Sequence, residues 1–268
     1  MDIKPTVSRI TIYPVKSLDG VSLQESLVGE GGCLLHDREY AIADLDGNLI
    51  TGKRNPLIHF LRSTIDFEND LISFRQQEET TWHSFHIQKE TQAIDFYLSE
   101  FFGIPSKLLQ NKYGRFLDIP DISGITILST ASLRTVAHWF DDMNLEETRR
   151  RFRATIEIEG VPPFWEDQLF SKKDTTIEYT IGEVTLFGIS PRARCIVPTR
   201  NPETGEGIHS FPKTFAGHRA ASLPIWSNLK EFGHYYHLSV DCYIPPGEIG
   251  KYIRVGNEVT IVGEKILK

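Results

Sequence analysis

The side chain with the greatest chemical potential in this sequence is the thiol of Cys195. Arg192 and Arg194 precede it, and a segment rich in Pro and Thr follows it and ends in a turn at residues 201–205. Positive charge beside a thiol stabilises the thiolate, which is the form that attacks electrophiles and binds soft metals. The alternative is that Cys195 is a small buried hydrophobic residue, as most free cysteines are. The two arginines alone do not decide between these interpretations.

Three other segments carry groups that bind anions. Lys16 and Ser17 end the first predicted strand with an ammonium and a hydroxyl group, both good donors to phosphate or carboxylate. Arg38 follows Asp37, so it can either bind an anion or form a surface ion pair of little energetic value. Residues 149–153 contain four arginines, which either complement a helix dipole or bind an anion. Arg153 lies where that helix passes into a strand, and its planar guanidinium suits bidentate capture of phosphate.

Composition excludes several classes of protein. The chain has 268 residues and a formal net charge of -7, so a general binder of nucleic acid or of anionic membranes is disfavoured. Any anion site must therefore be a local basic cluster. The three cysteines, Cys33, Cys195 and Cys242, are widely separated, which fits neither a disulfide framework nor a CxxC metal site. They are too few for an iron–sulfur cluster, so a redox enzyme of this sequence would need a separate electron donor.

The beginning of the chain shows no apolar leader, and no apolar run is long enough to span a bilayer. Together with the free cysteines, this predicts a soluble cytoplasmic protein without a membrane anchor. His234 and His237 are three residues apart in a predicted strand, which would place them on opposite faces, so we expect no shared metal there. Residues 44–47 resemble part of a calcium loop but lack its remaining acidic positions, and we interpret them as a hairpin turn.

The residue pattern predicts strands in the first and last thirds of the chain and helices between them. Alternating apolar residues predict strands at 7–13, 38–45, 61–67, 71–74, 82–87, 155–159, 176–179, 183–189, 234–243 and 253–262. Apolar residues at helical spacing predict helices at 91–102, from 129 or 130 to about 143, and at 146–151. The fold class is then mainly β (α+β), with a barrel or sandwich at the N-terminus. A break at Gly103 and Pro105 suggests two domains, 1–105 and 106–268.

Eight short motifs, in this order, carry a family resemblance. They are 13–17 with Gly20, Gly31-Gly32, Asp37-Arg38, 127–133, 151–153 with 165–167, Arg194-Cys195 with Thr199 and 201–205, 232–235, and 253–257. The chain resembles a MOSC-domain protein preceded by a MOSC N-terminal β-barrel domain. The resemblance implies an N-terminal β-barrel domain over residues 1–105, followed by a MOSC β-barrel domain with interspersed helices over residues 106–268. The chain is similar to the amidoxime reducing components of mitochondria and their bacterial counterparts.

This resemblance implies a molybdenum cofactor (molybdopterin) held through its pterin phosphate. It implies that Cys195 ligates molybdenum and that five further residues surround the cofactor, namely Lys16, Ser17, Arg38, Arg153 and Arg194. Ser129 and Thr130 are carried over with them, and Thr155 stands where the family often has Asn. Thr155 keeps a donor and an acceptor but is shorter, so its contact would be weaker or bridged by water. Pyridoxal phosphate is left open as another phosphate-bearing ligand.

The function implied is a molybdenum-dependent oxidoreductase that reduces N-hydroxylated or N-oxygenated small compounds. Its electrons would come from an external donor protein of the ferredoxin or reductase type. Two alternatives remain open. The first is a carrier of the cofactor or of sulfur, with a persulfide on Cys195. The second is a binding module that has lost the cofactor.

Overall fold

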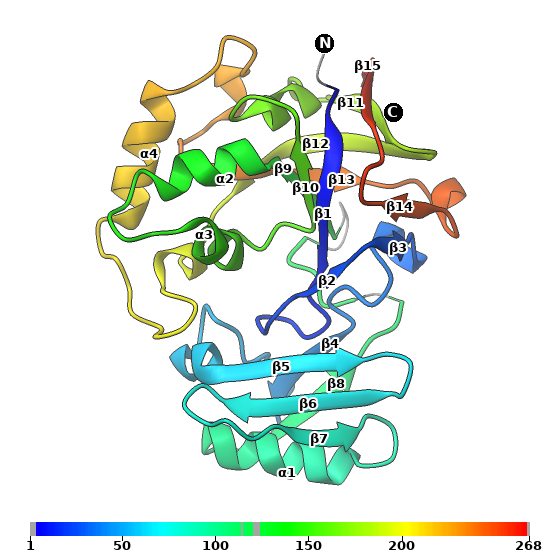
Figure 1. Ribbon diagram of the computed structural model, residues 1–268, viewed down its shortest axis with the longest axis vertical. Coiled ribbons are helices and arrows are strands. Elements are labelled where there is room, and N and C mark those ends of the chain that lie inside the picture. Colours follow the sequence, from blue (N-terminus) through cyan, green and yellow to red (C-terminus); the bar gives the residue numbers. More distant parts are fainter. Residues whose placement is uncertain (1–3, 114, 120–123, 267–268) are drawn as a thin grey trace.

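The structure is a computed structural model that describes residues 4–113, 115–119 and 124–266 (Figure 1). Its largest element is an eight-stranded sheet with the strand order β15-β11-β12-β13-β9-β10-β1-β2. The bounds of these strands are β1 (Thr6–Ile12), β2 (Val21–Leu23), β9 (Ile125–Ser129), β10 (Ile156–Glu159), β11 (Thr175–Ile181), β12 (Val184–Ala193), β13 (His237–Tyr243) and β15 (Val259–Ile266).

Three small sheets complete the β structure. They pair β3 (Glu25–Leu27) with β14 (Tyr252–Arg254), β4 (Tyr40–Asp44) with β8 (Ser106–Gln110), and β5 (Leu61–Asp66) with β6 (Leu71–Gln76) and β7 (His83–His86). The mainly β prediction is confirmed. None of the four sheets that the described residues form closes on itself into a barrel.

Four α-helices lie outside the sheets. They are α1 (Thr91–Phe102), α2 (Thr130–Ala137), α3 (Leu145–Phe152) and α4 (Phe211–Ala221), counted over the residues that the structure describes. The prediction of α1 is confirmed, and Gly103 ends it in a left-handed conformation at φ 66°. Ser129 caps α2 by accepting a hydrogen bond from the Ser132 amide. The helix ends six residues before the predicted end, and the chain then turns through Asp142 at φ 61°.

Local turn chemistry explains the elements that were predicted well. The hairpin of β5 and β6 forms around Asn69 and Asp70, as expected. The Asp44 carboxylate accepts hydrogen bonds from the amides of Asp46 and Asn48, which confirms the predicted hairpin turn. Four strands (β2, β3, β8 and β9) and helix α4 were not predicted.

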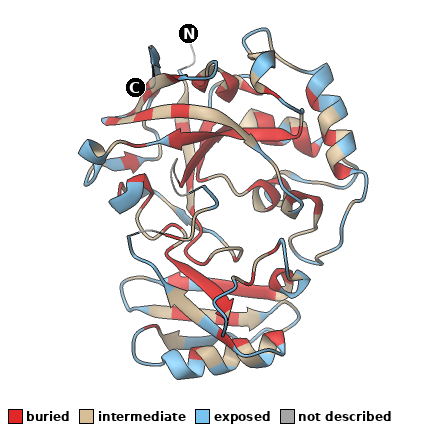
Figure 2. Cartoon of the chain, turned by 180° about the vertical axis from the view of Figure 1, so that it is seen from behind, coloured by how far each residue is buried: buried red, intermediate tan, exposed pale blue. Residues whose placement is uncertain are grey.

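The described residues form three apolar cores, of which the third lies among α2, α3 and α4. The elements that hold the first two lie one above the other in Figures 1 and 2. The first belongs to the large sheet and includes Val7, Ile10 and Ile12 of β1 beside residues of β9 to β13. The second lies among β4 to β7 and α1. The strand β1 thus belongs to the sheet formed mainly by the second half of the chain. The boundary after residue 105 remains a prediction, and the large sheet crosses it.

Candidate active site

A pocket lies between the loops of the N-terminal segment and those that follow α3 and β12. Among the described residues its lining holds ten basic side chains and two acidic ones, in a chain with a net charge of -7. Such a concentration of positive charge favours an anionic ligand. The basic residues are Lys16, Arg38, Lys53, Arg62, Arg150, Arg151, Arg153, Arg192, Arg194 and Arg200.

Cys195 lines the pocket and is exposed, whereas the other two cysteines are buried. It follows the end of β12, directly after Arg194. Burial raises the pKa of Cys33 to about 11 and that of Cys242 to about 12. These two thiols therefore stay neutral and inaccessible at neutral pH, and Cys195 is the cysteine that a ligand in the pocket can reach.

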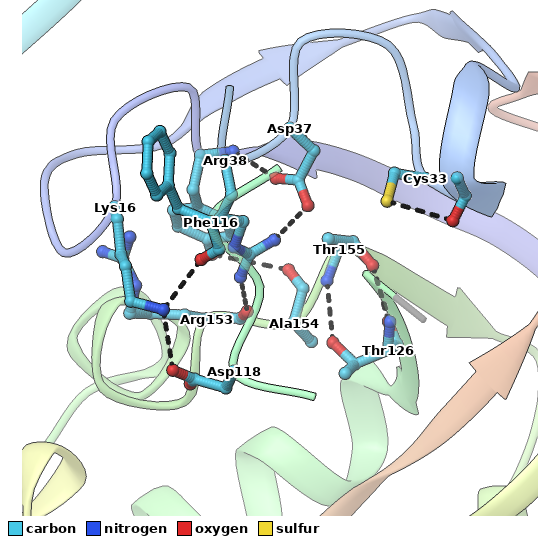
Figure 3. A network of polar contacts seen from close by, with 12 residues as sticks. Lys16, Cys33, Asp37, Arg38, Phe116, Asp118, Thr126, Arg153, Ala154 and Thr155 are labelled. Carbon is cyan, nitrogen blue, oxygen red and sulfur yellow. Dashed lines mark hydrogen bonds and ion pairs between the residues drawn. The ribbon is translucent and has the colours of Figure 1, made fainter. Parts of the chain in front are cut away.

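Lys16 follows β1 and points toward two oxygen atoms (Figure 3). Its Nζ donates to the Phe116 carbonyl at 2.7 Å and to Asp118 Oδ1 at 2.8 Å. Burial lowers the pKa of Lys16, while Asp118 raises it in part. Its neighbour Ser17 also lines the pocket, and its Oγ accepts a hydrogen bond from the Gly52 amide.

Two guanidinium groups pack on the ring of Tyr13. The carbon of the Arg38 guanidinium lies 4.6 Å from the ring centroid and that of Arg153 lies 4.1 Å from it. Arg38 forms an ion pair with the buried Asp37, whose other oxygen accepts from the Tyr13 amide. Arg38 also donates to the Arg153 carbonyl at 3.4 Å (Figure 3). The stack brings both cations to the pocket from opposite halves of the sequence.

The four arginines of residues 149–153 do not share one role. Arg149 pairs with Glu146 and Glu157, Arg151 with Glu147, and Arg150 with Glu203. For Arg153, the described residues offer no carboxylate at ion-pair distance. Burial lowers its pKa to about 10, so it remains a cation at neutral pH. Of these four arginines, Arg153 is the one whose charge is available to a ligand.

Arg194 is a second cation without a carboxylate partner in the described part of the chain. Its Nη2 donates to the Phe152 carbonyl at 2.6 Å, and its buried Nε has no hydrogen-bond partner there. Burial, together with the charge of nearby Arg192, lowers the pKa of Arg194 to about 10. By contrast, Arg192 pairs with Asp118 and Asp241.

Three predicted site residues lie outside the pocket lining. The Ser129 hydroxyl is fully buried and caps α2. Thr130 shares hydrogen bonds with Ser8 and Glu157. The Thr155 hydroxyl accepts from the Thr126 amide and donates to the Thr126 carbonyl, which joins β9 to the start of β10 (Figure 3). Their hydroxyl groups are engaged within the fold, and their roles at a cofactor remain predictions.

The pocket also contains residues that the sequence analysis did not assign to the site, among them Tyr13, Asp118, His59, Arg62 and Arg200. Arg200 lies five residues after Cys195 in the sequence, and this proximity could have indicated that it belongs to the same site. For His59 and Arg62 no local pattern was available, because only the fold brings them to the thiol.

The two histidines of residues 234–237 differ from expectation. β13 begins only at His237, so the alternation of a strand does not apply between them, and their rings stack at a centroid distance of 4.3 Å. The prediction that they lie on opposite faces is therefore wrong. Within the described ranges, no group of three or more His, Cys, Asp or Glu residues could hold a metal ion.

Comparison with protein families identifies the class. Residues 4–105 match the MOSC N-terminal beta barrel domain, and residues 120–260 match the MOSC domain. The second match alone spans more than half of the chain, so the protein belongs to the MOSC-domain family.

Its relatives include the mitochondrial amidoxime reducing component 2 of Bos taurus, 25% identical over 86% of this chain and 78% of the relative. The mitochondrial amidoxime-reducing component 1 of Mus musculus is 23% identical over 97% of this chain and 83% of its own length. The molybdenum cofactor sulfurase of Solanum lycopersicum is 22% identical over 97% of this chain, which matches 36% of that larger protein. In the part of our chain that the structure describes, no helix is long and apolar enough to cross a membrane.

Proposed function

We propose that this protein binds a molybdenum cofactor and reduces N-hydroxylated or N-oxygenated small compounds with electrons from a separate donor protein. The observation that carries the proposal is a single pocket in which an accessible thiol, Cys195, lies with cations from both halves of the chain. The names of the relatives, which refer to amidoxime reduction and to the molybdenum cofactor, support the same reaction class.

The residues present fit a ligand that carries a phosphate and a soft metal. Arg153 and Arg194 have no carboxylate partner among the described residues, and the buried Nε of Arg194 is unsatisfied. Buried donors of this kind are costly unless a ligand engages them. A thiolate is the ligand that suits a soft metal. The pocket therefore offers both kinds of group that the cofactor requires.

Each residue has a distinct task in this proposal. Lys16, Arg38 and Arg153 hold the phosphate, and each charge-assisted hydrogen bond contributes about 1.5–3 kcal/mol net. Cys195 supplies the thiolate ligand, and Arg194 supplies positive charge beside it. When bound, the cofactor exchanges electron pairs or oxo groups, chemistry that protein side chains do not provide.

Lys16 is held ready for this task by its partners. Asp118 and the Phe116 carbonyl fix the ammonium group, and the carboxylate opposes the fall of the pKa of Lys16 that burial causes. The ammonium ion has three hydrogens, so two of these bonds leave one for a phosphate oxygen. Asp118 therefore acts as a positioning residue for Lys16.

Molybdenum content tests the proposal. Wild type, Cys195→Ala and Ile196→Ala are purified from a host that makes the cofactor, and metal is measured by elemental analysis. We expect Cys195→Ala to lose most of its molybdenum. Ile196→Ala, which changes an exposed neighbour, should retain it. Equal molybdenum in wild type and Cys195→Ala would refute the role of the thiol.

A second candidate function is a carrier of the cofactor or of sulfur, with a persulfide on Cys195. The similarity to the molybdenum cofactor sulfurase of Solanum lycopersicum supports this second candidate function, because the matched region covers 97% of this chain. Turnover separates the two. Reduction of an N-hydroxylated compound with an artificial electron donor supports the enzyme, whereas cofactor binding without turnover supports the carrier.

A further inference from the structure

Besides Arg194 Nε, three polar atoms of the pocket lining are buried and have no hydrogen-bond partner among the described residues. They are His59 Nε2, Arg62 Nε and Arg200 Nη1. His59 is 8% exposed and Arg62 is 9% exposed, so water reaches these side chains poorly. Unsatisfied buried polar atoms are rare in folded proteins. Three of them in one pocket indicate a ligand group that is not part of the chain.

These side chains are held by the fold. His59 lies in the 3₁₀ turn η2 (Pro56–Phe60), Arg62 lies in β5, and Arg200 follows the 3₁₀ turn η4 (Val197–Thr199). Arg62 pairs with Asp19 at 3.2 Å and donates to the carbonyls of His59 and Pro202. These bonds leave its Nε free while they fix the plane of the guanidinium.

Charge in this part of the pocket is also unbalanced. Arg200 has no carboxylate at ion-pair distance in the described residues, and neither has nearby Arg153. Burial, together with the charges of Arg200, Arg62 and Arg153, lowers the pKa of His59 to about 4, and the Gly52 backbone opposes this shift. A phosphate monoester carries a charge of about -1.5 to -2 near neutral pH. If Lys16, Arg38 and Arg153 hold that phosphate, the charge of Arg200 remains without a counterion.

We propose that His59, Arg62 and Arg200 form a second oxyanion site in this pocket, in addition to the phosphate site of Lys16, Arg38 and Arg153. Its ligand is a carboxylate or a phosphate group, which a planar guanidinium and an imidazole bind through directed hydrogen bonds. The inference rests on the proposed function only for the source of this oxyanion in the cofactor-loaded enzyme. In the holoenzyme, the second oxyanion belongs either to the substrate or to a second phosphate of the cofactor.

Binding of inorganic phosphate to the full chain, purified from a host without the cofactor, tests the site itself. Calorimetry should detect two phosphate ions per wild-type chain. Arg200→Gln should weaken one of them by at least tenfold and leave the other, whereas Lys16→Gln should have the opposite effect. Arg54→Gln removes the same charge from an exposed loop beside the pocket and should leave both within about threefold.

Thermal unfolding of each variant shows that the chain is folded, and His59→Gln provides a second route if Arg200→Gln is not. One phosphate ion per wild-type chain, unaffected by Arg200→Gln and His59→Gln, would overturn the second site. Two phosphate ions in a chain that never retains molybdenum would support the site while the proposed function failed. The two failures are thus distinguishable.

The holoenzyme distinguishes the sources of the oxyanion. For a substrate source, Arg200→Gln should raise the KM of a carboxylate-bearing N-hydroxylated compound at least tenfold and leave that of its methyl ester unchanged. For a cofactor source, Arg200→Gln should lower cofactor content, and the extracted cofactor should carry a second phosphate. If Arg200→Gln had the KM and the cofactor content of wild type, the second site would have no role in the holoenzyme.

Discussion

At the scale of single residues, backbone strain coincides with the candidate site. Ser17, Arg38 and Arg153 have φ values of 71°, 49° and 54°, in the left-handed region that favours glycine. A side chain there costs about 1–2 kcal/mol relative to the right-handed conformation. All three line the pocket. Strain retained at such positions is typical of sites where function requires a particular side chain.

Arg153→Gly should therefore leave the chain without cofactor as stable as wild type, or more stable by about 1 kcal/mol. Glycine relieves the strain at φ 54° and removes a buried cation that lacks a carboxylate partner among the described residues. The same variant should lose phosphate affinity at least tenfold. Urea unfolding and phosphate calorimetry measure both effects. A loss of more than 1 kcal/mol in stability would contradict the assignment of strain.

His59 should make stability depend on pH. Burial and three arginines lower its pKa to about 4, below the ordinary value of 6.5, so the folded chain favours the neutral ring. Between pH 6.5 and 4 the unfolded chain binds more protons, and the free energy of unfolding falls as pH falls, by about 3 kcal/mol for this group. Above pH 6.5 the effect vanishes. His237, with a pKa lowered to about 4, adds a similar fall.

Urea unfolding at pH 7.5 and pH 4.5, in buffer free of phosphate, measures the contribution of His59. His59→Gln should show a smaller loss of stability between these two pH values than wild type. His209→Gln, a change at an exposed histidine, should behave as wild type. An unchanged loss in His59→Gln would show that the ring is not the group that titrates.

The sequence singled out those candidate site residues whose chemistry is visible in a short segment. Cys195 beside Arg194, and Lys16 at the end of a strand, carry their signal locally, and the fold brings both to one pocket. Of the arginine cluster, the sequence could not tell that Arg153 alone lacks a carboxylate in the described structure, because its neighbours find partners elsewhere in the fold. The sequence could not predict a role for His59 either, because the lack of a hydrogen-bond partner for its Nε2 arises only from packing in the folded chain.

At the scale of elements, prediction succeeded where local pattern and end signals agree. α1 has apolar residues at helical spacing and Gly103 at its end. β9 was missed because it is buried on both faces and shows no alternation of polar and apolar residues. α4 was missed because Pro212 and Gly217 obscure it, although Pro suits the first turn of a helix.

Two glycines in these elements predict opposite effects of the same substitution. A Cβ at Gly188 in β12 would lie 1.7 Å from the Leu169 carbonyl oxygen, so Gly188→Ala should destabilise the chain by about 3 kcal/mol or prevent folding. A Cβ at Gly217 in α4 would meet nothing within 4 Å, so Gly217→Ala should stabilise it by about 0.5–1 kcal/mol. Thermal unfolding of both variants measures the difference. Equal effects would contradict the close approach at Gly188.

At the scale of the whole molecule, the pocket depends on contacts between distant parts of the chain. Lys16 reaches Phe116 and Asp118, Arg62 reaches Pro202, and Arg38 reaches the Arg153 carbonyl. The first core also depends on contacts between distant parts of the chain, because β1 pairs with β10 and contributes fully buried residues to it. A ligand in the pocket therefore stabilises one cooperative structure, by about 2.7 kcal/mol at 100 times its Kd.

This arrangement predicts that residues 106–268 do not fold alone, although a family boundary falls near residue 105. Without β1, the sheet would expose the edge of β10 and lose Val7, Ile10 and Ile12 from the core, each at most 1% exposed in the full chain. Each such side chain contributes about 1.5–3 kcal/mol when buried, which together exceeds the margin of many domains. Circular dichroism and urea unfolding should show no cooperative transition for 106–268. Addition of 1–105 should restore one. A cooperative transition of 106–268 alone would refute the structural dependence of the second half on β1.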